Sequence, residues 1–336
     1  MSKDRTYIIA EAGVNHNGRL DLAYRLCDAA KEAGADAVKF QTWKTENLIT
    51  HNVSQAEYQS DNTGKRESQF DMLKKLELSY SDFRHVKEYC DEIGITFAST
   101  ADEKESLNFL TDLGIPFVKI GSGDIGNVSY LRYIGSKALP VILSTGMSTI
   151  SDVDLSVNAL CEGGLTRDKI TLLHCTTNYP CPFDQVNLQA MKTLKSTFHL
   201  PVGYSDHTIG TEVAVAAVAL GATVIEKHFT LDRHMPGPDH IASTEPEEFR
   251  HMVNEIRNIE RAIGNGIKAP TPSEVNIARA VTKRIVASAS IQKGEKFTED
   301  NITIKRNNAG LEASYWDIVL GKQAVKNFAV DEGIDF

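Results

Sequence analysis

The feature that most constrains this chain is a regular alternation of short apolar runs with longer amphipathic segments, which extends from Tyr7 to about residue 265. The longer segments, such as LDLAYRLCDAAKEAG and SDFRHVKEYCDEIG, carry apolar residues at helical spacing and end at a glycine. Strands that alternate with helices in this way require parallel crossover connections. The apolar runs that we interpret as strands span residues 7–10, 37–40, 95–98, 117–120, 141–143, 170–173, 202–204 and 223–225.

Eight strand–helix units within about 265 residues are typical, in number and in length, of a (β/α)8 TIM barrel. The alternative is a doubly wound open sheet, but no glycine-rich dinucleotide-binding turn follows the first strand. The alternation is interrupted once, by a long polar stretch at about residues 42–79. We interpret this stretch as a lid or wall over the site, because long loops in compact domains are usually functional.

The C-terminal part of the chain follows a different pattern. The stretch GNGIKAPTPS at residues 264–273 is rich in glycine and proline, as domain boundaries often are. Beyond Val281 the sequence alternates like a strand, as in IVASASIQKGEKF. We therefore predict a barrel at residues 1–265, a linker at 266–280 and a small second domain at 281–336.

Composition limits the functions open to the chain. The apolar content of 41% and the charged content of 24% are those of a soluble globular protein. A net charge of −9 without a basic cluster disfavours nucleic-acid binding, and no apolar run approaches the ~18 residues of a membrane span. The five cysteines include no C-x-x-C pair and the N-terminus has no apolar leader, so we expect reduced thiols in the cytoplasm.

Polar or ionisable residues follow almost every predicted strand. In a (β/α)8 barrel the reacting groups lie at the C-terminal ends of the strands, so these residues would share one rim. A purely structural scaffold has no need for such a pattern. The polar residues at these ends include Glu11, Lys39, Gln41, Thr100, Lys119, Ser122, Asp124, Ser144, His174, Thr177, Tyr179, Ser205, Asp206, His207, Glu226, Lys227 and His228.

Two of these residues, His207 in YSDHT and His228 in EKHFT, end the seventh and eighth predicted strands. Neighbouring parallel strands lie roughly 5 Å apart, so both imidazoles would emerge at a spacing that suits two ligands of one metal ion. The alternative is that each is a hydrogen-bonded loop histidine. Two histidine ligands would leave coordination positions for water and substrate, an arrangement suited to polarising a carbonyl.

Lys39 in AVKF and Lys119 in FVKI each follow an apolar run, which points them into the barrel mouth. There they would neutralise a phosphate or a carboxylate, whereas the alternative for each is a surface charge. Glu11 ends IIAEAG, where it is either a catalytic carboxylate or part of a structural salt bridge. Together these residues imply attack on an aldehyde or ketone by a phosphorylated co-substrate.

Eight motifs occur in order along the chain: IIAEAGVNHNG (8–18), AVKFQTWK (37–44), VKIGSGD (118–124), ILSTGM (142–147), LLHCTTNYPCP (172–182), GYSDHT (203–208), IEKHFT (225–230) and PGPDH (236–240). With them the chain resembles the sialic acid synthases over its whole length. Its C-terminal module at about 281–336 resembles the antifreeze-like (SAF) domain. The family makes nine-carbon 3-deoxy keto acids from phosphoenolpyruvate and an N-acetylated hexosamine.

The resemblance implies that Glu11 is catalytic and that Mn²⁺, or another divalent ion such as Mg²⁺ or Co²⁺, is bound by His207 and His228, which act in catalysis with it. It implies that phosphoenolpyruvate is bound by Lys39, Thr100, Lys119, Ser122, Ser144 and Ser205. It implies that the sugar is bound by Gln41, Asn62, Asp124, Tyr179, Asp239 and Arg306. Arg306 would come from a partner subunit, because the resemblance implies a domain-swapped homodimer.

The enzyme so implied is a transferase that condenses phosphoenolpyruvate with N-acetylmannosamine, giving an N-acetylneuraminate-type acid and phosphate. The alternative within the family is a legionaminate or pseudaminate synthase that uses a 2,4-diacetamido-trideoxyhexose. Three departures bear on which sugar is used: Asp124, where many members carry glutamate, Thr177, where some carry asparagine, and the RNNAG run at 306–310. An alternative from another class, a non-catalytic carbohydrate- or ice-binding protein, is disfavoured by the complete set of candidate catalytic residues.

Overall fold

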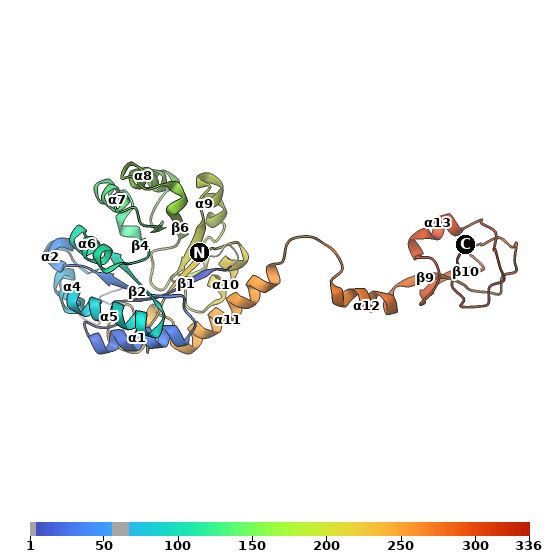
Figure 1. Ribbon diagram of the computed structural model, residues 1–336, viewed down its shortest axis with the longest axis horizontal. Helices are drawn as coiled ribbons and strands as arrows, with labels where there is room; N and C mark the ends of the chain where they lie inside the picture. Colours follow the sequence, from blue (N-terminus) through green and yellow to red (C-terminus); the bar gives the residue numbers. More distant parts are fainter. Residues whose placement is uncertain (1–4, 56–66) are drawn as a thin grey trace. The chain divides into compact units, whose positions relative to one another are not determined.

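The computed structural model describes residues 5–55 and 67–336, and the chain divides into two compact units, Met1–Gly264 and Asn265–Phe336. The first unit is a closed barrel of eight parallel strands in chain order, surrounded by helices (Figure 1). The strands are β1 (Tyr7–Gly13), β2 (Ala37–Thr42), β3 (Thr96–Ala101), β4 (Val118–Ile120), β5 (Val141–Ser144), β6 (Ile170–His174), β7 (Val202–Asp206) and β8 (Val224–His228).

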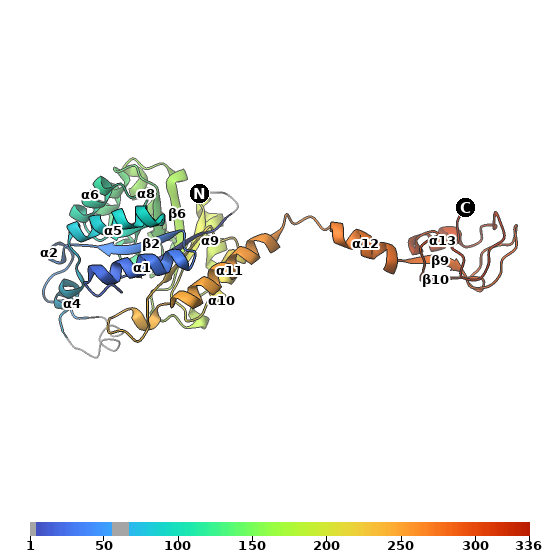
Figure 2. The same cartoon turned by 60° about the horizontal axis from the view of Figure 1, so that its bottom comes forward.

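The barrel closes because β1 pairs with both β2 and β8, which confirms the predicted TIM barrel and excludes the open sheet. After each strand a helix leads back toward the next one (Figure 2). The α-helices of this unit in the described residues are α1 (Leu20–Glu32), α2 (Thr45–Leu48), α4 (Gln69–Leu76), α5 (Tyr80–Ile93), α6 (Lys104–Leu113), α7 (Val128–Gly135), α8 (Ile150–Glu162), α9 (Ala190–Phe198), α10 (Glu212–Ala219) and α11 (Pro246–Ile263).

All eight predicted strands are present, but several continue further toward the rim than their apolar runs. β1 extends to Gly13 and β8 extends to His228, so Glu11 and His228 lie within strands rather than after them. The backbone ladder continues at these positions, where Glu11 is opposite Lys39 on one side and His228 on the other. The side chains of Glu11 and His228 are therefore positioned by the backbone of the sheet, not by flexible loops.

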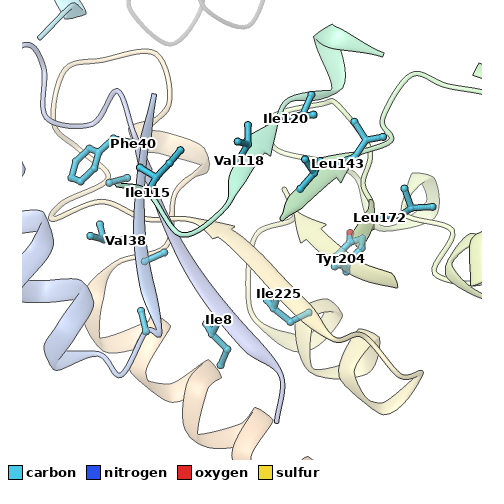
Figure 3. Close-up of a cluster of buried hydrophobic side chains, with 14 of the residues drawn as sticks. Ile8, Val38, Phe40, Ile115, Val118, Ile120, Leu143, Leu172, Tyr204 and Ile225 are labelled. Carbon is cyan, nitrogen blue, oxygen red and sulfur yellow. The ribbon is translucent and has the colours of Figure 1, made fainter. Parts of the chain in front are cut away.

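Alternate residues of the strands contribute to two different cores, because successive side chains of a strand point to opposite faces. One set packs against the surrounding helices, as Figure 3 shows for Ile8, Val38, Leu143 and Ile225. The other set is a smaller cluster inside the barrel, which we call the apolar floor. It consists of Ile9, Ala37, Ala98, Phe117, Ile142, Leu173 and Val224.

The second unit has its own small core, which includes Ile285, Phe297 and Phe328. It is built around the antiparallel strands β9 (Lys283–Ala287) and β10 (Ile302–Arg306), with a short helix α13 (Trp316–Val319). The segment predicted as a linker, 266–280, is not wholly irregular. It contains most of helix α12 (Pro272–Val281), which starts with a capping box between Thr271 and Glu274.

No helix in the described part of the chain has the length and apolar character needed to cross a membrane. All five cysteines are free. The cytoplasmic location stays a prediction.

Candidate active site

A cavity of about 220 Å³ opens at the C-terminal ends of the barrel strands. Its polar walls follow from the strand period. Each residue of the apolar floor is followed two positions later by a residue that lines the cavity, because residues i and i+2 of a strand point to the same side. These wall residues are Glu11, Lys39, Thr100, Lys119, Ser144, Cys175 and Glu226.

Lys39 lies between two carboxylates inside the barrel. Its Nζ is 2.5 Å from Oε2 of Glu11 and 3.8 Å from Oε2 of Glu226, and it donates to Oγ1 of Thr100 at 3.0 Å. Gln41 donates to the other oxygen of Glu11, Oε1, at 3.0 Å. Lys39 is only 2% exposed, which excludes the alternative of a surface charge.

Lys119 occupies the corresponding position two strands along. Its Nζ donates to Oγ of Ser144 at 2.8 Å and lies 3.3 Å from Oε1 of Glu226. Ser205 also donates to that oxygen, at 2.9 Å. Lys119 is 3% exposed and Glu226 is 4% exposed, so these charges are withdrawn from water and depend on one another.

The two carboxylates of this cluster are shifted in opposite directions. Burial raises the pKa of Glu11 to about 7, and the neighbouring Glu226 adds to this effect although Lys39 opposes it. For Glu226 burial acts in the same direction, but Lys119 and Lys39 outweigh it and lower the pKa to about 2. When Glu11 is protonated, the positive charges of Lys39 and Lys119 outweigh Glu226 in the deep part of the cavity. This arrangement favours an anionic ligand.

His207 and His228, at the ends of β7 and β8, come together beside this cluster, with ring centroids 5.5 Å apart. Nδ1 of His207 donates to the carbonyl oxygen of Thr176 at 2.7 Å, which leaves Nε2 with its lone pair. Nδ1 of His228 is buried and has no hydrogen-bond partner in the described part of the chain. Burial lowers the pKa of both imidazoles, so both are neutral near pH 7.

Neutral, incompletely satisfied imidazoles fit the donor set of a divalent transition-metal ion. Within residues 5–55 and 67–336 no third histidine, cysteine or carboxylate joins them in a metal-binding group. An ion held here would therefore take two ligands from this chain and the rest from water or substrate. The hydrogen bond of His207 is equally consistent with the loop-histidine alternative, which stays open for that residue.

Most residues predicted for the site line this single cavity: Glu11, Lys39, Gln41, Thr100, Lys119, Ser122, Ser144, Tyr179, Ser205, His207 and His228. Asp124 and Asp239 do not line it. Asp124 ends the 3-10 helix η1 (Ser122–Asp124) and accepts a hydrogen bond from Asn127, while burial raises the pKa of Asp239 to about 6. Arg306 ends β10 in the second unit, and Asn62 lies outside the described residues.

Two polar residues that the sequence placed at the rim, Asp206 and Lys227, do not line the cavity. Asp206 and Lys227 are 2.7 Å apart and form an ion pair that is almost completely buried. Because they alternate with Ser205 and His228, which line the cavity, they point to the outer side of the barrel wall. Their expected place among the reacting groups is therefore wrong.

Sequence reasoning also left some wall residues without a role, notably Glu226, Asp102 and Cys175. The period of two could have assigned Glu226 and Cys175, since they lie two positions after Val224 and Leu173 of the apolar floor. The same period continues past the end of β3, from Ala98 through Thr100 to Asp102, and could have assigned Asp102 as well.

Comparison with known proteins identifies a family pattern and close relatives. The pattern of the NeuB family matches residues 26–268, and that of the SAF domain matches residues 283–336. An N,N'-diacetyllegionaminic acid synthase of Campylobacter jejuni is 48% identical over 328 residues, which cover 98% of each chain. A protein of the same name from Legionella pneumophila is 45% identical over 325 residues, covering 96% of this chain and 91% of the relative.

A solved structure is similar over most of the chain. It is the crystal structure of an N-acetylneuraminic acid (sialic acid) synthetase from Leptospira borgpetersenii in complex with citrate. The two chains superpose with a TM-score of 0.71 at 34% identity, over 83% of this chain and 93% of that one.

Proposed function

The chain belongs to the NeuB family, and we propose on that premise that it makes N,N'-diacetyllegionaminic acid. Phosphoenolpyruvate and an open-chain 2,4-diacetamido-trideoxyhexose would form the nine-carbon keto acid and phosphate. The broader statement does not depend on the sugar. The chain is a phosphoenolpyruvate-dependent synthase of the sialic acid type, a transferase with a TIM barrel and a SAF domain.

The choice of sugar is supported by the similarity to the two relatives. Both are named for N,N'-diacetyllegionaminic acid, and they are 48% and 45% identical over nearly the whole chain. The similar crystal structure, named for N-acetylneuraminic acid, is 34% identical. N-acetylmannosamine, placed first on the sequence motifs, therefore becomes the second candidate.

The observation that carries the reaction class is the pair of buried lysines, Lys39 and Lys119, directly above the apolar floor. Their positive charges would hold the phosphate and carboxylate of phosphoenolpyruvate. The hydroxyl groups of Thr100 and Ser144 already contact the lysines and are available to donate to the same anion. Ser122 and Ser205, which line the cavity, would add to this set.

The reaction forms a bond between C3 of phosphoenolpyruvate and the aldehyde carbon of the sugar. Water then adds at C2, and phosphate leaves with cleavage of its C–O bond. Glu11, which lies beside Lys39 in the deep part of the cavity, is suited to take the proton from that water. Its Oε1 is held by Gln41 and its Oε2 by Lys39, so the carboxylate has a fixed orientation, and its raised pKa makes it an effective base near neutral pH.

We further propose that His207 and His228 hold Mn²⁺ or a similar divalent ion, which would polarise the sugar aldehyde. The two neutral imidazoles support this assignment. Tyr179, whose ring centroid is 4.2 Å from that of His207, would orient the sugar beside them.

Replacing His207 by alanine is expected to weaken Mn²⁺ binding by at least about 100-fold, because half of the protein ligands are lost. Binding is measured from the electron paramagnetic resonance signal of free Mn²⁺ in a titration, which does not depend on turnover. His85→Ala, at an exposed position of α5, is the control and should bind like the wild type. Unchanged affinity in His207→Ala would refute the metal assignment.

We also propose that the active unit is a homodimer in which the SAF domain of one chain contributes Arg306 to the barrel of the other. Arg306 lies in the second unit of the chain, and the barrel cavity has acidic residues near its mouth but no arginine among its lining residues in the described part of the chain.

The function is tested by measuring phosphate release from phosphoenolpyruvate with a panel of acetamido sugars, in the presence of Mn²⁺ and of a chelator. We expect kcat/KM for a 2,4-diacetamido-trideoxyhexose to exceed that for N-acetylmannosamine by about 10-fold or more, and the chelator to abolish release. A preference for N-acetylmannosamine would favour the second candidate. If no sugar supports phosphate release, the proposed enzyme activity is wrong.

A further inference from the structure

Asp102 lines the cavity but has no assigned role. It directly follows β3, so it lies one step closer to the rim than Thr100 and Lys119, which are opposite each other in the barrel sheet. Its backbone N–H donates to the carbonyl oxygen of Thr42 at 3.2 Å, which anchors the residue to the neighbouring strand. The position of Asp102 is thus as well defined as that of the strand ends.

The side chain of Asp102 is not explained by the fold. An acidic residue just before a helix often caps its N-terminus, and α6 begins at Lys104. That role is already filled by Glu103, whose carboxylate accepts from the backbone N–H groups of Glu105 and Ser106. In the described part of the chain no group donates a hydrogen bond to the Asp102 carboxylate, and no lysine or arginine lies within ion-pair distance of it.

The surroundings of Asp102 make an unpaired carboxylate costly. Burial raises its pKa to about 7, and the nearby Asp124 adds to this effect although Lys39 opposes it. Burial also raises the pKa of Asp124. Asp102 is partly buried in the cavity wall. A carboxylate withdrawn from water without donors is unfavourable, and a ligand that supplies an N–H or O–H donor would reduce this cost.

The cavity is therefore polarised from its floor to its mouth. Its deep part carries Lys39 and Lys119 with their hydroxyl partners, which suit an anion. Its outer part, on the side of β3 and β4, carries Asp102 with Asp124 nearby, which repel an anion. Of the two substrates of the proposed reaction, only the neutral sugar suits the outer part.

We propose that Asp102 determines sugar specificity by accepting a hydrogen bond from an acetamido N–H or a hydroxyl group of the open-chain sugar. This inference rests on the proposed function, since it assumes that an acetamido sugar is the second substrate. Asp102 acts on binding of the sugar and takes no part in binding phosphoenolpyruvate. Because the donor is matched by an otherwise unpaired, partly buried acceptor, a sugar that lacks it is disfavoured.

The test is the kinetics of Asp102→Asn, which keeps the shape of the side chain but replaces one acceptor oxygen by a donor. We expect kcat/KM for the preferred sugar to fall about 10- to 100-fold, the loss of one hydrogen bond to a charged group, and the KM for phosphoenolpyruvate to stay within about twofold. Asp102→Ser, which also lacks the carboxylate, should show the same fall in kcat/KM for the sugar and the same unchanged KM for phosphoenolpyruvate. Asp112→Asn, at an exposed position of α6, is the matched control and should show neither change.

The possible outcomes separate this inference from the function on which it rests. If the wild type turns over and both Asp102 variants retain its sugar kinetics, Asp102 is not a specificity determinant. An equal rise in the KM of both substrates would also overturn the inference, because it would place Asp102 in the anion site or in a structural role. If the wild type releases no phosphate with any sugar, the proposed function fails first.

Discussion

Glu11→Gln is expected to lower kcat by about 10³-fold or more while the barrel stays folded, because the variant cannot accept a proton. The amide retains the size of the carboxylate, and Lys39 keeps Glu226 as its second negative partner at 3.8 Å. The measurement is phosphate release under saturating substrates, with circular dichroism to check the fold. Glu92→Gln, at an exposed position of α5, is the control.

The pH dependence distinguishes a catalytic Glu11 from a structural one. Its pKa is raised to about 7, so the basic form is present above pH 7 and is lost as the pH falls through that value. Wild-type kcat at saturating substrates, where sugar binding by Asp102 does not contribute, should therefore decrease below about pH 7, and the residual kcat of Glu11→Gln should lack this step.

The contribution of Glu11 to stability changes with pH in the opposite direction from its contribution to activity, and this provides a second check. Because the folded protein binds the Glu11 proton more tightly than the unfolded chain does, this group stabilises the fold at low pH and loses that contribution as the pH rises from 4.5 to about 7. Glu11→Gln should thus be at least as stable as the wild type at pH 8. A loss of several kcal/mol there, of the ~3–5 kcal/mol size seen when a buried pair is broken, would instead identify a structural salt bridge.

The same variant tests the proposed sharing of sites between subunits. Neither Glu11→Gln nor Arg306→Ala should be active alone, but in mixed dimers one barrel would combine an intact Glu11 with an intact Arg306. Random exchange should restore about a quarter of the sites, since half of the dimers are hybrids and each has one complete site. No recovery, with hybrid dimers shown to form, would mean that the second unit does not complete the barrel of its partner.

Asp206→Ala is expected to destabilise the protein by about 3–5 kcal/mol, because it leaves the buried ammonium group of Lys227 without its counter-charge. Both side chains are at most 1% exposed and lie 2.7 Å apart. Asp206 also accepts hydrogen bonds from the backbone and the hydroxyl of Thr208, while Lys227 donates to the carbonyl oxygen of Thr208. The pair therefore fixes the turn that carries His207.

Urea unfolding monitored by tryptophan fluorescence measures this effect. The control is Glu162→Ala, which breaks the ion pair with Arg132, whose side chains are both 55% exposed. It should cost no more than about 1 kcal/mol. The double variant Asp206→Leu with Lys227→Met should regain much of the lost stability, since no buried charge remains. If Asp206→Ala is as mild as Glu162→Ala, the pair does not hold the barrel wall.

The fold could be predicted because it depends on patterns along the chain. The apolar runs and the helical spacing between them are local, and eight such units are typical of a closed barrel. The strand ends were less predictable. Glu11 and His228 belong to β1 and β8 although they are polar, because the interior of the barrel changes from apolar to polar within a strand while the backbone pairing continues.

The positions of the site residues were predicted partly by the same local rule. Lys39 and Lys119 could be assigned to the interior because they follow apolar strands, and the structure buries both. The rule does not distinguish neighbours such as Glu226 and Lys227, which are both polar and both near a rim. Glu226 lines the cavity and Lys227 pairs with Asp206 outside it, because adjacent residues of a strand face opposite sides.

The sequence by itself determined the barrel, the second unit and the kinds of side chain at the rim, since these follow from periodicity and from the ends of strands. Only the tertiary structure decided which of those side chains share a partner. Lys39 lies between Glu11 and Glu226, residues more than 200 positions apart, and Asp102 faces the cavity without a partner among the described residues. Such pairings depend on distances across a closed barrel, where the register of β8 against β1 brings the first and last strands of the barrel together.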